Sequence, residues 1–283
     1  MYSKFEYYQP QTISEAIEQM ENSDGKVAVL NGGTDVIVRM NQGRCPDIML
    51  DIKGISGLDK IEVRDDMIHI GALVRHIDLL ENSLIQEKVP VLIEAVKTIG
   101  TPQVRNLGTL SGNICNSSPV ADSFTALMIL DAKVLICGKD YEREVSIAEF
   151  QTGPGKNVLN GKEIVKEIIV PVPKDNFVAH FEKLGPRKAA DIAIVNVAVS
   201  MEIEEGICVN AKVALGAVAP KIIYAKSAQE TLIGKKVDEI NAQIVAQAAE
   251  DDATPISDFR SSKEYRNEMV SVLVERAIRN ILE

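Results

Sequence analysis

Apolar positions in the first part of the chain change from helical to extended spacing and back again. In residues 12–20 they recur at the three- and four-residue spacing of an amphipathic helix. Residues 26–30 form an apolar run of strand length, which stops at Asn31-Gly32-Gly33. The helical pattern resumes over residues 34–43. The pattern therefore predicts a strand, a glycine-containing loop and a helix in immediate succession.

The same spacing rules predict the other elements. Strands are expected at residues 48–52, 61–63, 67–71, 133–137, 142–146, 164–170, 178–184, 194–203 and 208–218. Helices are expected at residues 75–82, 91–99, 123–130, 225–233, 237–249 and 263–282, and a long loop at 100–118. Strands followed by helices in the last third predict an α+β layer, with helices covering one face of a sheet.

A chain of 283 residues is long for a single core, so two domains are expected. The best boundary is Pro171-Val172-Pro173, which is followed by the polar Lys174-Asp175-Asn176. We therefore expect one domain over residues 1–174 and a second, α+β domain over residues 175–283.

Two segments carry candidate chemistry. The first is Val29-Leu30-Asn31-Gly32-Gly33-Thr34-Asp35-Val36, and the second is Gly108-Thr109-Leu110-Ser111-Gly112-Asn113. Glycines permit close approach of a backbone to a ligand, and backbone N–H groups with nearby hydroxyls bind anions. Together the two segments predict a cradle for the pyrophosphate of a dinucleotide, although each loop alone could be an ordinary turn.

Charge and motif content exclude several other classes. The net charge of −10 disfavours binding to nucleic acid or to anionic lipid. Cysteines at 45, 115, 137 and 208 are too far apart for a zinc or iron–sulfur motif. The start lacks a signal peptide, and no apolar run has membrane-spanning length, so a cytoplasmic protein is expected. Neither the Gly-x-Gly-x-x-Gly fingerprint nor a P-loop is present.

Four ordered stretches resemble the FAD-binding subunit of xanthine dehydrogenase-type molybdenum hydroxylases, the carbon monoxide dehydrogenase medium-subunit family. They are 31–35 (NGGTD), 101–123 (TPQVRNLGTLSGNICNSSPVADS), 163–171 (EIVKEIIVP) and 181–193, which contains Phe181-Glu182-Lys183-Leu184 and Asp191-Ile192-Ala193. The resemblance covers nearly the whole chain.

The resemblance implies a two-lobed FAD-binding fold of the vanillyl-alcohol oxidase type, followed by a C-terminal α+β domain. The small lobe would span residues 1–55 and the larger lobe residues 56–174. It implies that FAD is held by the following residues: Val29, Leu30, Asn31, Gly32, Gly33, Thr34, Asp35, Val36, Ile99, Gly108, Thr109, Leu110, Ser111, Gly112, Asn113, Asp122, Val165 and Lys183. Ile99 stands where some relatives place an aromatic side chain, and Ser111 where the family commonly has glycine.

The resemblance also implies a function. FAD would receive electrons from iron–sulfur clusters on a partner subunit and pass them to NAD or another acceptor, while a molybdopterin subunit oxidises xanthine or a related purine. No catalytic side chain or metal ligand is expected from this chain. A free-standing FAD-dependent oxidase or dehydrogenase and a non-enzymatic assembly protein remain as alternatives.

Several other residues have expected roles. His69 is expected to be structural, and Cys115 to pack as a small residue. Arg105 could contact phosphate or form an exposed salt bridge. A Gly32→Val substitution is expected to clash with the ligand and to leave the fold largely intact. Basic residues of the C-terminal helices are expected to form a mostly solvated face: Arg260, Lys263, Arg266, Arg276 and Arg279.

Overall fold

A computed structural model describes residues 4–187 and 190–283. The first unit is a parallel three-stranded sheet in the order β1-β3-β2, formed by Glu6–Tyr8, Ile48–Asp51 and Val27–Leu30. Its helices are α1 (Ile13–Glu21) and α2 (Val36–Asn41), with a 3₁₀ turn, η1, at Ile52–Gly54. The expected helix at 12–20 is confirmed, and the Thr12 hydroxyl caps it by accepting from the Glu15 N–H. The short strand β1 was not foreseen.

The second unit is an antiparallel five-stranded sheet in the order β4-β5-β10-β6-β7. Its strands are Ile61–Arg64, Met67–Gly71, Ile164–Pro171, Lys133–Gly138 and Tyr141–Ser146. The strands expected at 61–63 and 67–71 pair as a hairpin, and so do the strands expected at 133–137 and 142–146. The helices of this unit are α3 (His76–Glu81), α4 (Ser83–Lys88), α5 (Pro90–Lys97), α6 (Pro102–Leu107), α7 (Leu110–Asn116), α8 (Asp122–Ile129) and α9 (Ile147–Phe150). A small ribbon of β8 (Gln151–Gly153) and β9 (Lys156–Asn157) completes it.

The expected long loop at 100–118 is wrong, because most of it forms α6 and α7. Thr101 caps α6 and is followed by Pro102 in the first helical turn, while Thr109 caps α7. Helix α6 has no buried residue and α7 combines a glycine with several polar residues, so neither shows a clear apolar face.

The third unit is an antiparallel four-stranded sheet in the order β11-β12-β13-β14. Its strands are Phe177–Leu184, Val195–Glu204, Ile207–Gly216 and Ile223–Tyr224. Three helices follow: α10 (Lys226–Leu232), α11 (Ala242–Asp252) and α12 (Lys263–Leu282), with a 3₁₀ turn, η2, at Val237–Glu239. The helix expected at 237–249 therefore begins later, after the Asn241 cap.

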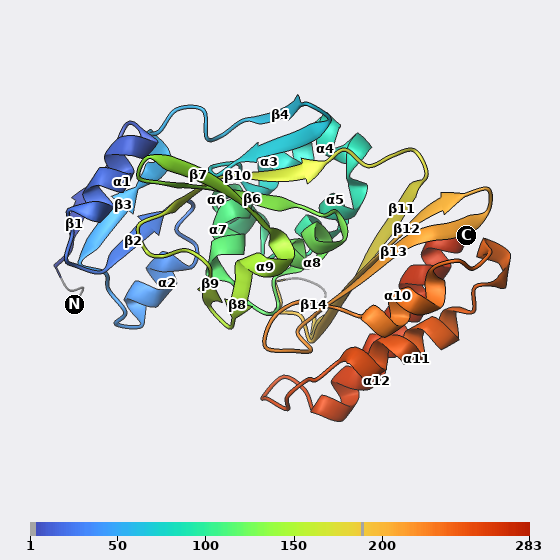
Figure 1. The fold of residues 1–283 in the computed structure, drawn as a ribbon. Helices are drawn as coiled ribbons and strands as arrows, with labels where there is room; N and C mark the ends of the chain where they lie inside the picture. Colours follow the sequence, from blue (N-terminus) through green and yellow to red (C-terminus); the bar gives the residue numbers. More distant parts are fainter. Residues whose placement is uncertain (1–3, 188–189) are drawn as a thin grey trace.

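Both faces of this third sheet are covered. Helices α10 and α12 pack on one face, and α11 packs against both of these helices, on the same side of the sheet in Figure 1. On the other face, α5 and α8 of the second unit contact β11, β12 and β13. Every residue of α8 is buried, because the helix lies between two sheets. The expectation that helices would cover one face was therefore incomplete.

Candidate functional site

The first glycine loop begins where β2 ends. Asn31 donates its side-chain amide to the Ala72 carbonyl at 3.0 Å, which ties the loop to the end of β5. Gly33 has φ of +75°, in the left-handed region that favours glycine. The Gly33 carbonyl accepts from the Ile37 N–H at 3.1 Å as α2 begins. The loop is thus a turn that leads directly into a helix.

The second loop joins α6 to α7 and is anchored to the larger lobe. The Gly108 carbonyl accepts from the His76 N–H at 2.9 Å, and the Leu110 N–H donates to Val74 at 3.1 Å. The Thr109 hydroxyl accepts from the Gly112 N–H at 3.0 Å and caps α7. These three bonds fix the backbone of the loop from Gly108 to Gly112.

The two loops touch each other. A Cβ on Gly32 would lie 1.9 Å from the Leu107 carbonyl oxygen and 2.9 Å from the Gly108 Cα. A Cβ on Gly108 would in turn lie 3.4 Å from the Thr34 hydroxyl. Glycine at both positions is what allows the two backbones to meet.

This contact corrects the expectation for Gly32→Val. The added side chain would meet the protein's own backbone, so the variant must displace one loop from the other even without a ligand. Gly32 therefore has a structural role as well as any role toward a cofactor.

Polar side chains strengthen the junction between the loops. Asn116, at the end of α7, donates to the Asp35 carboxylate at 3.3 Å and accepts from the Arg39 guanidinium of α2. The loops are therefore held together by α2 and α7 as well as by the glycines.

The junction offers free hydrogen-bond donors. Among residues 4–187 and 190–283, none accepts a hydrogen bond from the N–H groups of Gly32, Gly33 or Thr34. All three residues are half-buried. A half-buried N–H group needs an acceptor, and consecutive N–H groups in a glycine turn suit an anion. The residues present therefore fit the pyrophosphate of FAD.

Asp122 and Lys183 form a buried ion pair between the second unit and the C-terminal sheet. The Lys183 ammonium lies 2.7 Å from Asp122 and 3.4 Å from a carboxylate oxygen of Asp191, and it donates to the Thr98 carbonyl at 3.1 Å. The side chains of Asp122 and Lys183 are each 6% exposed. The Asp191 carbonyl also accepts at 3.4 Å, so four acceptor atoms surround an ammonium that has three protons.

The Asp122 carboxylate is held by further groups. Asn196 of β12 donates to it at 2.7 Å, and the Thr98 hydroxyl at 3.2 Å. Burial raises the pKa of Asp122, and the charge of Lys183 opposes this rise. The node fixes α5, α8, β11 and β12 relative to one another.

Other residues predicted to bind the cofactor lie in α7, after α5 and in β10. Asn113 accepts from the Ser123 hydroxyl at 2.7 Å, which links α7 to the start of α8. Ile99 is buried at the end of α5, two positions before the Thr101 cap. Val165 is buried in β10, within the core of the second unit. Contact of Ile99, Asp122, Val165 and Lys183 with FAD stays a prediction.

Ser111, which stands in the second loop where the family commonly has glycine, points inward. Ser111 is 1% exposed, and its hydroxyl lies against the Cys115 thiol. Burial raises the pKa of that thiol to about 12, so the cysteine stays protonated and unreactive near neutral pH. A serine at this position therefore leaves the outer surface of the loop unobstructed.

Two basic side chains point inward. Arg105 donates to the Ile99 carbonyl at 2.7 Å and has no salt bridge within residues 4–187 and 190–283, so the alternative of an exposed salt bridge is wrong. Its contact with phosphate stays a prediction. Arg266 is 2% exposed and donates to the Ile194 and Ala217 carbonyls and to Asp258. Its place on the expected solvated face is therefore wrong, because α12 turns this side chain toward the sheet.

His76 is a residue that the sequence pattern did not single out. It is 2% exposed beside Gly108, and its Nδ1 has no hydrogen-bond partner among the described residues. Burial, with a smaller effect from the Arg105 charge, lowers the pKa of His76 to about 4. The imidazole is therefore neutral at physiological pH.

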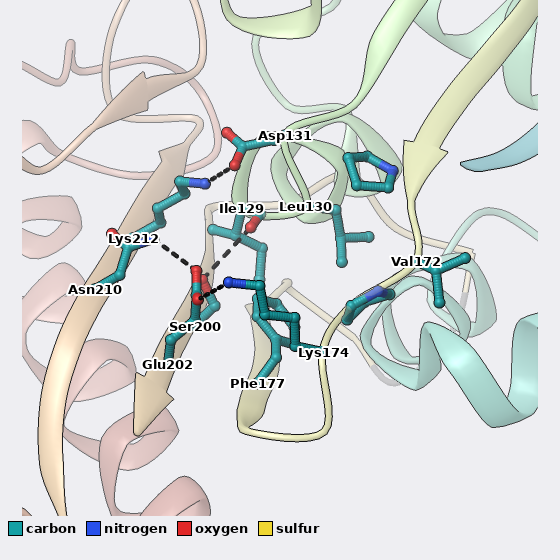
Figure 2. Close-up of a pocket in the computed structure, with 12 residues that line it drawn as sticks. Ile129, Leu130, Asp131, Val172, Lys174, Phe177, Ser200, Glu202, Asn210 and Lys212 are labelled. Carbon is teal, nitrogen blue, oxygen red and sulfur yellow. Dashed lines mark hydrogen bonds and ion pairs between the residues drawn. The ribbon is translucent and has the colours of Figure 1, made fainter. Parts of the chain in front are cut away.

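A separate cavity of about 130 Å³ lies at the opposite end of α8 from Asp122. Ile129 and the segment around Lys174 form part of its wall. Figure 2 shows Lys212 paired with Asp131, and Lys174 facing Glu202. Nζ of Lys174 lies 3.5 Å from Oε2 of Glu202. An eight-residue helix is about 12 Å long, so this cavity is distinct from the Asp122 node. Its charged groups are already paired with each other.

The fold and the paired loops define a flavoprotein of the FAD-binding type. The model of the FAD binding domain in molybdopterin dehydrogenase matches residues 3–173, and that of the CO dehydrogenase flavoprotein C-terminal domain matches residues 180–281. The chain belongs to this family of FAD-binding subunits of molybdenum hydroxylases. It is an FAD-containing oxidoreductase subunit.

Individual relatives agree over the full length. The chain is 31% identical to the glyceraldehyde dehydrogenase medium chain of Sulfolobus acidocaldarius, over 98% of each chain. It is 31% identical to the xanthine dehydrogenase FAD-binding subunit of Escherichia coli O157:H7, over 98% of this chain and 96% of the relative. A solved carbon monoxide dehydrogenase from Hydrogenophaga pseudoflava superposes with a TM-score of 0.95 at 30% identity, covering 99% of this chain and 98% of that chain.

No helix within residues 4–187 and 190–283 has the length and apolar character required to cross a membrane.

Proposed function

We propose that this chain is the FAD-carrying electron-transfer subunit of a cytoplasmic, multi-subunit molybdenum hydroxylase that oxidises xanthine or a related purine. Electrons would arrive from iron–sulfur clusters on one partner chain, which receives them from a molybdopterin chain. NAD, or another carrier, would take them away. The observation that carries the proposal is the contact of the two glycine loops beside unbonded N–H groups.

In this proposal the chain's own residues bind and orient the cofactor. The N–H groups of Gly32, Gly33 and Thr34 would hold the pyrophosphate, together with the start of α7 near Thr109. Bound FAD supplies the one- and two-electron chemistry. The Asp122–Lys183 ion pair would keep the C-terminal sheet fixed against the second unit beside the cofactor.

The placement of the metal centres on partner chains has support in the positions of the cysteines. Cys137 is buried with the core of the first unit, and Cys208 with the helices of the C-terminal unit. These two thiols belong to separate hydrophobic clusters, so they are not placed to share an iron–sulfur cluster. The xanthine substrate is supported by the 31% identity to a xanthine dehydrogenase subunit, although a glyceraldehyde dehydrogenase chain is equally similar.

A glycine pair tests the role of the loops. Gly33 and Gly43 both have positive φ, at +75° and +82°, but only Gly33 lies in the proposed cradle. Alanine introduces similar backbone strain at either position. We expect Gly33→Ala to lower the FAD content of the purified chain and Gly43→Ala to retain it. Equal FAD content in the two variants would contradict the assignment of the first loop.

The role in a complex is tested by purification from the native cells. Iron and molybdenum should be found in the chains that co-purify with this protein. The complex should reduce NAD or a dye with xanthine as substrate. Turnover of a small organic substrate by the isolated chain would favour a free-standing flavin enzyme instead.

A further inference from the structure

Two buried polar atoms beside the second loop have no hydrogen-bond partner among the described residues. One is Nδ1 of His76, at the start of α3, and the other is Nε of Arg105, in α6. Helices α3 and α6 contact each other, and the Arg105 charge acts on His76. Buried polar atoms without partners are rare and cost stability, so each requires a physical reason.

The two atoms are chemically complementary. His76 is neutral at physiological pH, so Nδ1 can accept a hydrogen bond when the proton is on the other ring nitrogen. Arg105 keeps a donating Nε–H, because its Nη1 is the atom that binds the Ile99 carbonyl. One hydrogen bond, direct or through one water, would satisfy both atoms.

The position of this pair connects it to both glycine loops. A Cβ on Gly108 would lie 3.3 Å from Cδ2 of His76 and 3.4 Å from the Thr34 hydroxyl. The His76 N–H also donates to the Gly108 carbonyl at 2.9 Å. His76 therefore lies at the point where the first loop, the second loop and α3 meet.

Arg105 extends the connection to the turn between α5 and α6. Its Nη1 donates to the Ile99 carbonyl at 2.7 Å and is 3.5 Å from that of Gly100. Ile99 is a predicted flavin neighbour, and Gly100 has a positive φ of +50°. A bond from Arg105 to His76 would thus lock this turn against the second loop.

We propose that His76 and Arg105 are positioning residues which form this hydrogen bond when FAD occupies the loops, and so fix the Ile99–Gly100 turn against Gly108. The inference rests on the proposed placement of FAD at the two loops. Without FAD, the two atoms stay unpaired at a cost in stability. With FAD, the pairing contributes to cofactor affinity.

The test compares four variants of the full chain, each with FAD and after FAD removal. His76→Leu removes the acceptor, and His76→Asn keeps an acceptor near the place of Nδ1. Arg105→Lys keeps the charge and the reach toward Ile99 but lacks the Nε–H. The fourth variant combines His76→Leu with Arg105→Lys.

We expect His76→Leu to weaken FAD binding about tenfold, which corresponds to about 1.4 kcal/mol, the upper range for one hydrogen bond. Arg105→Lys should weaken FAD binding similarly. The double variant should bind FAD with about the affinity of whichever single variant binds it less tightly. His76→Asn should restore most of the affinity. The FAD-free His76→Leu protein should unfold at the same or a higher denaturant concentration than the FAD-free parent.

Three results would overturn the inference: unchanged FAD affinity in His76→Leu, additive effects in the double variant, or a loss of FAD-free stability as large as the loss in the FAD-bound protein. The last result would show that His76 stabilises the fold regardless of whether FAD is bound. The placement of FAD at the two loops is tested by a separate experiment: equal FAD content in Gly33→Ala and Gly43→Ala would contradict it.

Discussion

Gly32 and Leu107 lie in direct backbone contact, so that a Cβ on the glycine would be 1.9 Å from the leucine carbonyl oxygen. The contact joins the end of the parallel sheet to the end of α6. It fixes the first loop, with its unbonded N–H groups, against a second loop that lies about 75 residues further along the chain.

This contact predicts the effect of Gly32→Ala. The methyl group cannot fit, so we expect the loops to separate, with a loss of about 1–3 kcal/mol of folding free energy and of bound FAD. Denaturant unfolding and the flavin absorbance of the purified protein measure the two effects. Gly153 has no atom within 4 Å of an added Cβ, so Gly153→Ala is the control and should retain both. A stable, FAD-replete Gly32→Ala protein would refute the contact.

The cap of α7 gives a second prediction. Thr109→Ala removes the acceptor of the Gly112 N–H and should cost about 1 kcal/mol of stability. It should also weaken FAD binding, because the start of α7 belongs to the proposed cradle. Thr109→Ser keeps the hydroxyl and should resemble the parent in a fluorescence titration with FAD. If alanine and serine behave alike, the cap does not support the site.

The buried ion pair predicts a large effect of Lys183→Met. The variant leaves Asp122 without its cation in a place where both side chains are 6% exposed. We expect a loss of about 3–5 kcal/mol in the free energy of unfolding, measured with urea. Adding Asp122→Asn should recover part of it, because the buried charge is then gone. Lys139 is exposed, and Lys139→Met should change little.

Arg266 predicts a contrast within one helix. Arg266→Met leaves the Ile194 and Ala217 carbonyls without their donor and should cost about 3 kcal/mol. Arg276 lies on the same helix and is 56% exposed. Arg276→Met should change the stability by less than about 0.5 kcal/mol. Comparable melting temperatures for the two variants would contradict the buried position of Arg266.

His180 predicts how stability depends on pH. Glu182 and Glu94, both 3.2 Å from the ring, raise the pKa of His180 to about 9. The folded state therefore binds the proton more tightly than the unfolded state. The resulting stabilisation is complete below pH 6.5 and is lost as the pH rises through about 9.

The expected loss is on the order of 2 kcal/mol. His180→Gln should flatten the dependence of unfolding free energy on pH over this interval. An equally steep dependence in the variant would assign the titration to another group.

Periodicity predicted most of the regular elements, because a strand or a helix with one buried face shows its period locally. The helix at Lys263–Leu282 and the strands β12 and β13 were predicted in this way. The helices α6 and α7 were missed, because α6 buries no residue and α7 is rich in polar residues and glycine, so neither has a clear apolar face. Arg266 was misplaced because its charge suggested exposure, although it stands at helical spacing in line with the buried Val270 and Leu273.

The sequence by itself determined the class of protein, since the ordered motifs and glycine loops are local properties of the chain. The tertiary structure alone decided that Gly32 meets Leu107, that Asp122 pairs with Lys183, and that Nδ1 of His76 and Nε of Arg105 are buried without a partner among the described residues. These relationships join segments far apart in the chain. They depend on how the sheets and helices pack, which no local pattern of residues specifies.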